Sequence, residues 1–283
     1  MIPRKLSIFI SFFRFGFDFQ HFLILLTCIG IACLVLLPLS CTTHSTHTIY
    51  LLSLTYTSSI PTPLTQTLHR NLSSLLPPNT QNNALTIRIG FRGICMASPI
   101  ASWRWECAQH VTTLKNTITS TSTSTSTNST THIDFDTDPL NLLQLADSVR
   151  KRIVFDGLLY ISLALTLFTL VLLTLIPRWK ADRNSDTDSE RQVKSFPSRA
   201  LSFTLCLASG SAFLFASVSI LWQHLAAVTT SRFIERMSYG GVVAKVGSNA
   251  MVIGWLGVLM LWFAFMGCLL MVLSMRKVRR TFG

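Results

Sequence analysis

Residues 89–107 read IGFRGICMASPIASWRWEC and combine two glycines, two tryptophans and two cysteines within a polar region of the chain. The surrounding segment 84–96 alternates apolar and polar side chains, which is the period of a β-strand with one buried face. The segment 48–56, TIYLLSLTY, is also rich in residues that favour strands. The apolar members of the alternation are Leu85, Ile87, Ile89 and Phe91. The sequence therefore predicts a small antiparallel sheet.

Long apolar runs lie on both sides of this polar region. Of the 283 residues, 49% are hydrophobic and only 13% are charged, whereas soluble domains contain about 25% charged residues. A helix needs roughly 20 residues to cross the hydrocarbon layer of a bilayer. The runs that reach this length are 22–40, 153–177, 200–222 and 251–275. They predict an all-α transmembrane four-helix bundle with a small extracellular antiparallel β-sheet.

The first run has an alternative interpretation as a cleaved signal peptide. Its apolar core is longer than the roughly 7–15 residues of such a peptide, and a long segment precedes it. We therefore expect the run to be retained as a membrane helix.

The distribution of lysine and arginine predicts the orientation. These residues collect in 1–21, 178–199 and 276–283, which lie on one side if four helices alternate, and cytoplasmic flanks are typically basic. Both termini are then cytoplasmic, and the loops 41–152 and 223–250 are extracellular. Arg150, Lys151 and Arg152, at the outer end of the second run, argue in the opposite direction.

The net charge of +12 alone would be compatible with a nucleic-acid partner. The apolar residues fall in uninterrupted runs and not on amphipathic faces, so we expect no nucleic-acid partner. The predicted partners are the lipid bilayer and other membrane proteins or protomers.

The long first loop contains two candidate N-glycosylation acceptors. Asn71 begins the tripeptide NLS and Asn128 begins NST. Asn128 lies in the Ser/Thr tract 117–131, which lacks the apolar residues needed to pack and predicts a spacer. The tract fits an O-glycosylated spacer and an unmodified linker equally well.

Cys95 and Cys107 lie well inside the same loop, and an extracellular loop is in an oxidising environment. A disulfide between them could stabilise a marginal sheet by about 3 kcal/mol. A metal or redox site would need further ligands, and the sequence offers none at suitable spacing. Cys41, at the membrane edge, has no assigned partner. The other cysteines, Cys28, Cys33, Cys206 and Cys268, lie within the apolar runs.

The loop resembles a known family at its glycines and cysteines. Glycine, an apolar residue, any residue, glycine, any residue and cysteine, followed by a second cysteine, form the first-loop signature of the claudin superfamily. The residues that carry it are Gly90, Phe91, Gly93, Cys95 and Cys107. The glycine-spaced form is similar to the fungal calcium-regulator and membrane-fusion family induced during mating.

This resemblance implies a multi-pass plasma-membrane protein that supports low-affinity calcium influx and membrane fusion during fungal mating, with calcium-channel components as candidate partners. The alternative is a claudin-like structural organiser of plasma-membrane domains, of the eisosome or pH-sensing type. A further alternative is an ion-conducting pore. No catalytic motif is visible, so we expect neither an enzyme nor a bound cofactor or metal.

Two features of the apolar runs are candidate functional positions. Asp156 is the only charged residue within them, and a carboxylate in a membrane is a functional candidate. It could line an ion path or pair with Arg152, which precedes it by four residues. Ala208, Ala212 and Ala216 form a stripe of small residues that favours close helix packing, within the bundle or between protomers.

Overall fold

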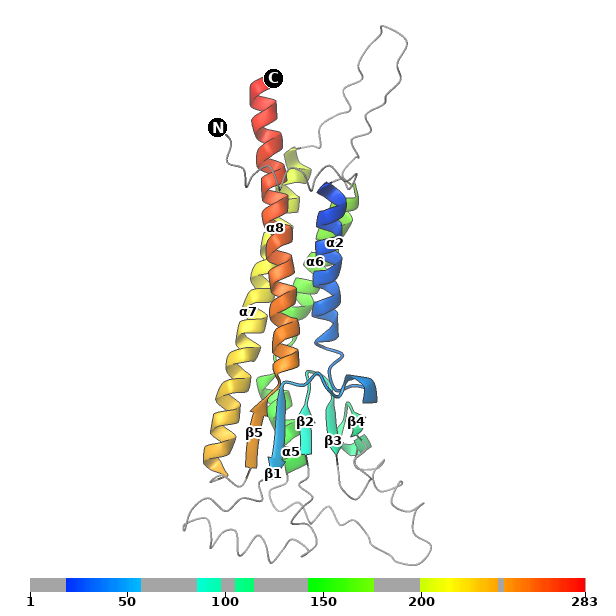
Figure 1. Cartoon of the computed structure of the whole chain (residues 1–283), viewed down its shortest axis with the longest axis vertical. Coiled ribbons are helices and arrows are strands. Elements are labelled where there is room, and N and C mark those ends of the chain that lie inside the picture. Colours follow the sequence, from blue (N-terminus) through cyan, green and yellow to red (C-terminus); the bar gives the residue numbers. More distant parts are fainter. Residues whose placement is uncertain are drawn as a thin grey trace, which may run out of the picture. The chain divides into compact units, whose positions relative to one another are not determined.

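The computed structural model describes residues 19–56, 86–97, 105–114, 142–175, 199–238 and 242–282 (Figure 1). The chain divides into two compact units. The helical unit takes in the residues up to Cys33, Leu158–Ser217 and the residues from Leu256 onward. The sheet unit takes in Leu34–Gly157 and Val218–Trp255.

Four helices are long and apolar enough to cross a membrane, as the sequence predicts. They are α2 (Phe19–Leu36), α6 (Gly157–Leu175), α7 (Arg199–Met237) and α8 (Ser248–Phe282). A shorter helix, α5 (Leu142–Ile153), precedes α6, and Val154–Asp156 form a non-helical break between the two. These uninterrupted apolar runs are helical because an α-helix pairs its own backbone N–H and C=O groups, which have no water to bond in the core of a bilayer.

The helical unit has an apolar core and an apolar outside. Leu23, Leu172, Leu173, Leu205 and Cys268 are buried together. Large apolar side chains are exposed on the same helices; they include Leu25, Phe168, Leu214 and Leu270. A helix that is hydrophobic all round is typical of a membrane span, because its outward side chains face lipid.

The sheet unit contains a five-stranded antiparallel sheet with the strand order β4-β3-β2-β1-β5. The strands are β1 (Leu52–Tyr56), β2 (Thr86–Ile89), β3 (Ile94–Ala97), β4 (Trp105–Ala108) and β5 (Val242–Val246). The expectation of a small antiparallel sheet is therefore confirmed.

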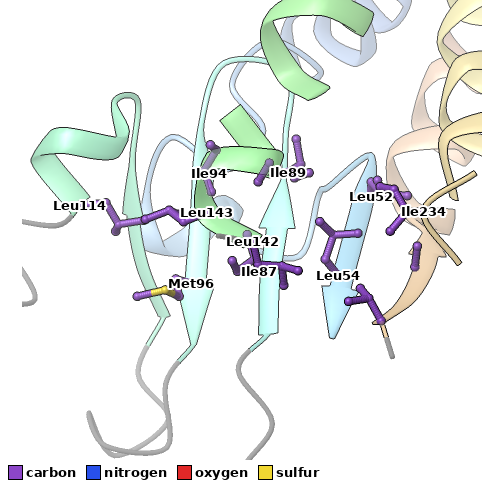
Figure 2. Packing of buried hydrophobic residues seen from close by; sticks show 13 residues of the cluster. Leu52, Leu54, Ile87, Ile89, Ile94, Met96, Leu114, Leu142, Leu143 and Ile234 are labelled. Carbon is purple, nitrogen blue, oxygen red and sulfur yellow. The ribbon is translucent and has the colours of Figure 1, made fainter. Parts of the chain in front are cut away.

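One face of the sheet packs against α5. Ile87 of β2 lies beside Leu142 of α5, and Ile94 of β3 and Leu54 of β1 belong to the same cluster (Figure 2). Ile234, near the end of α7, also packs in this core. The alternation of Ile87, Arg88 and Ile89 follows from the pleat of the strand. The two isoleucines are buried in this core, and Arg88 lies on the opposite face of the sheet.

The structure differs from the sequence prediction in three places. The segment 84–96 is not one strand, because β2 ends at Ile89 and the chain reverses into β3 at Ile94. The predicted extracellular loop 223–250 is largely regular, since it holds the end of α7, the whole of β5 and the start of α8. The predicted tail 276–283 is mostly a continuation of α8.

Candidate functional site: a cross-linked hairpin

The disulfide joins neighbouring strands of the sheet. Cys95 of β3 pairs with Cys107 of β4 in the strand register, and their sulfur atoms are bonded at 2.04 Å. The bond closes a loop with a sequence separation of 12 residues. A cross-link of this loop length stabilises mainly by restricting the unfolded chain, by about 3 kcal/mol. It therefore fixes β4, an edge strand, to the rest of the sheet.

Gly90 and Gly93 form the turn between β2 and β3. The amide of Gly90 donates to the carbonyl of Gly93 at 2.9 Å, which closes the hairpin. A Cβ atom on Gly93 would lie 1.8 Å from the carbonyl oxygen of Cys41, and one on Gly90 would lie 2.6 Å from that of Ser40. Both glycines are needed because another backbone segment passes directly against the turn.

That segment is the turn that follows α2. The amide of Phe91 donates to Ser40 Oγ at 2.8 Å, and the amide of Ser40 donates to the carbonyl of Leu37 at 3.0 Å. Cys41 has a φ of 54°, a left-handed conformation that is uncommon for a residue with a side chain. Gly90 and Gly93 therefore leave the space that Ser40 and Cys41 occupy, and we call these two glycines the glycine seat.

Cys41 itself is a buried free thiol. Its Sγ donates to the carbonyl of Ile49 at 3.5 Å, and burial raises the pKa of the thiol to about 12. The thiolate and not the thiol is the reactive form, so Cys41, which stays protonated near neutral pH, is unreactive there. The structure thus gives this cysteine a packing position beside the glycine seat.

The sheet face opposite the α5 core carries an aromatic clamp that the sequence analysis missed. The guanidinium of Arg88 lies between the rings of Tyr50 and Trp105, 4.7 Å and 3.9 Å from their centroids. Arg88 Nη1 donates to the carbonyl of His47 at 3.1 Å, and the His47 ring stacks on Trp105 at 5.4 Å. Cation–π contacts of this kind hold the 3-10 turn η1 (His44–Thr46) and its neighbours over the sheet.

Asp156 lies just outside the second membrane helix and not within it, because α6 begins at Gly157. One carboxylate oxygen of Asp156 is buried without a hydrogen-bond partner. Burial raises the pKa of this carboxyl, while the charges of Arg92 and Arg150 act in the opposite direction. Among the ion pairs of the described residues none joins Asp156 to Arg152, and the cations that act on its carboxyl are Arg92 and Arg150.

Arg150 ties α5 to the hairpin. Its Nη1 donates to the carbonyls of Arg92 and Gln109, and its Nη2 bonds Asp147 at 3.0 Å. A cation that argued against the predicted orientation thus has a structural role in the sheet unit. Its contacts with Arg92 and Gln109 could not be predicted, because these two residues are 58 and 41 positions away in the sequence.

The alanine stripe is used inside the helical unit. Ala208, Ala212 and Ala216 are all buried, and the carbonyl of Ala212 accepts a hydrogen bond from Ser162 Oγ of α6 at 3.0 Å. Small side chains allow the two helices to approach closely enough for this bond. Both predicted glycosylation acceptors, Asn71 and Asn128, lie outside the described residues.

A family model described as Ca²⁺ regulator and membrane fusion protein Fig1 matches residues 73–274, well over half of the chain. The match includes the glycine seat, both disulfide cysteines and the last three membrane helices. No curated protein matches the sequence.

Proposed function

Because the chain belongs to the Fig1 family of Ca²⁺ regulator and membrane fusion proteins, we propose that it supports low-affinity calcium influx and plasma-membrane fusion during fungal mating. The family description and the four membrane helices support a role in calcium regulation and fusion at a membrane. The finer role rests on the cross-linked hairpin, which would act outside the cell as a rigid recognition surface.

The proposal rests on the way in which the sheet is joined to the segment that follows α2. The disulfide fixes β4 to β3, and the turn between β2 and β3 contacts Ser40 and Cys41 in the segment that follows α2. A partner bound to the hairpin would therefore meet a surface that is firmly attached to the segment leaving the first membrane helix. Rigid surfaces lose little conformational entropy on binding, which favours recognition.

The test is calcium influx and cell fusion in mating cells that express Cys95→Ser, Cys107→Ser or both changes. We expect each single change and the double change to reduce both activities equally, because either one removes the same bond. Cys28→Ser is the matched control, since Cys28 is an exposed free thiol of α2. Full activity of Cys95→Ser at normal surface abundance would refute the role of the cross-linked hairpin.

Two other functions would give different results. A structural organiser of membrane domains would be present constantly in fixed cortical patches, whereas the proposed function requires induction by mating pheromone. A pore would pass calcium when the purified protein alone is reconstituted into vesicles. We expect no such flux, and we expect Asp156→Asn to leave cellular calcium influx unchanged, because Arg92 and Arg150 beside the carboxyl repel a cation.

A further inference from the structure

Basic residues gather where the sheet unit leads into the second membrane helix. Arg150, Lys151 and Arg152 form the last turn of α5, and only Ile153–Asp156 separate them from the start of α6 at Gly157. This placement is unexpected for a flank predicted to be extracellular, because basic residues normally collect on the cytoplasmic side. Arg150 has a structural role in this cluster, but Lys151 and Arg152 are exposed, so the predicted orientation leaves their position without an explanation.

Arg92 joins this group from the hairpin turn. Arg150 Nη1 donates to the carbonyl of Arg92 at 2.7 Å, across a sequence separation of 58 residues. The side chain of Arg92 is exposed, as are those of Lys151 and Arg152. We call these four residues, Arg92, Arg150, Lys151 and Arg152, the basic patch.

The patch keeps a net positive charge. Asp147 accepts from Arg150 at 3.0 Å and from Lys151 at 2.6 Å, and Asp156 is the second carboxylate nearby. Four cations and two carboxylates leave a charge of +2. The side chain of Lys151 is 66% exposed despite its ion pair, so the patch presents its charge to its surroundings.

An exposed aromatic ring adjoins the patch. Phe155 is 57% exposed and lies two residues before α6. Aromatic side chains directly beside a membrane span typically lie at the level of the lipid headgroups. A basic surface with a neighbouring exposed phenyl ring is the combination that binds a phospholipid surface, with cations on phosphate and the ring in the interface.

We propose that Arg92, Lys151 and Arg152 bind the phosphate groups of anionic phospholipids in the leaflet around the start of α6, with Phe155 inserted between the headgroups. The ring distinguishes this ligand from an acidic protein segment, because Phe155 belongs to the connection that enters the membrane. The proposal goes beyond calcium regulation and fusion and does not depend on either.

The test uses the full-length protein in vesicles of phosphatidylcholine with or without phosphatidylserine, and measures the association of spin-labelled forms of both lipids. The wild type should prefer phosphatidylserine. The double variant Arg92→Gln with Arg152→Gln should reduce this preference several-fold. The double variant Lys245→Gln with Arg236→Gln is the matched control, since it removes two exposed cations elsewhere on the sheet unit and should keep the preference.

The double variant Arg92→Lys with Arg152→Lys keeps both charges and controls for loss of folding. It should keep most of the preference for phosphatidylserine. Arg152→Gln alone should give an intermediate loss. An unchanged preference in the Arg92→Gln, Arg152→Gln variant would overturn the proposal and leave an acidic protein segment as the ligand class. An equal loss in the control would overturn it as well, because the effect would then come from net charge alone.

Discussion

The absence of a side chain at Gly93 allows the turn between β2 and β3 to lie directly against the backbone of Cys41. The added Cβ of Gly93→Ala would lie 1.8 Å from the Cys41 carbonyl oxygen, a backbone atom that cannot rotate away. We predict that this change lowers the free energy of unfolding by about 3 kcal/mol, because the hairpin and the segment after α2 would have to separate. Thermal unfolding of the purified protein measures the loss.

Gly210→Ala is the control for this prediction. Its added Cβ would meet only the edge of the Phe265 ring, at 3.1 Å, and alanine favours a helix over glycine. We expect a change of about 1 kcal/mol or less. If Gly93→Ala were as stable as Gly210→Ala, the close contact between the hairpin turn and Cys41 would be wrong.

Asp156 gives a prediction about pH. Burial raises the pKa of its carboxyl in the folded protein, and Arg92 and Arg150 only partly oppose this. A raised carboxyl pKa means that the folded state holds the proton more tightly. The stability it contributes is therefore present below the unfolded pKa of about 3.9 and is lost as pH rises through the folded pKa.

Asn at this position cannot ionise, so Asp156→Asn should lack this loss. Between acidic and neutral pH we expect the melting temperature of the wild type to fall relative to that of Asp156→Asn. All other titrating groups are shared and cancel in the difference between the two proteins. A difference that stays constant with pH, or that changes in the opposite direction, would contradict the raised pKa.

At the scale of the elements, periodicity predicted the sheet but not its turns. Ile87 and Ile89 alternate with Arg88 as a strand requires, and the same alternation continues through Gly90 and Phe91. The chain nevertheless reverses at Gly90–Gly93, because the two glycines allow the approach of Ser40 and Cys41. That partner is about 50 residues away, so a local pattern could not show it.

The end of α7 was missed for a different reason. The apolar run stops near Trp222, but the helix continues to Met237, and at 39 residues it is about 60 Å long. Its last turns pack Ile234 on the sheet, so burial against protein replaces burial in lipid. β5 was also missed, although its valine-rich stretch after a Gly-Gly pair is a typical strand signal.

The packing of α6 on α7 supplies an element-scale prediction. Ala212 is only 1% exposed, and its carbonyl accepts from Ser162 Oγ. Ala212→Leu should push the helices apart, break this bond and lower stability by about 2 kcal/mol. Ala200→Leu, at an exposed position of the same helix, should change stability little. Equal melting temperatures for the two variants would contradict the close approach of α6 and α7.

At the scale of the whole molecule, composition was the most informative signal. Four apolar runs predicted the four membrane helices, and the glycines and cysteines of one loop predicted the family, which the match over residues 73–274 confirms. Both features can be recognised in the sequence without knowledge of long-range contacts. The aromatic clamp around Arg88 and the basic patch could not be predicted, because each joins segments that are distant in the chain.

The orientation of the chain remains a prediction, and it can be tested on intact cells. Basic flanks place both termini in the cytoplasm, so a tag before Met1 or after Gly283 should become accessible to antibody only after permeabilisation. Lys245→Cys, on the exposed side of β5, should react with a membrane-impermeant maleimide from outside, with the wild type as the blank. Glycosidase treatment should increase the gel mobility of the wild type but not of Asn71→Gln with Asn128→Gln. Labelling of Lys245→Cys only after permeabilisation would reverse the orientation and place the cross-linked hairpin inside the cell, where a disulfide is not expected to persist.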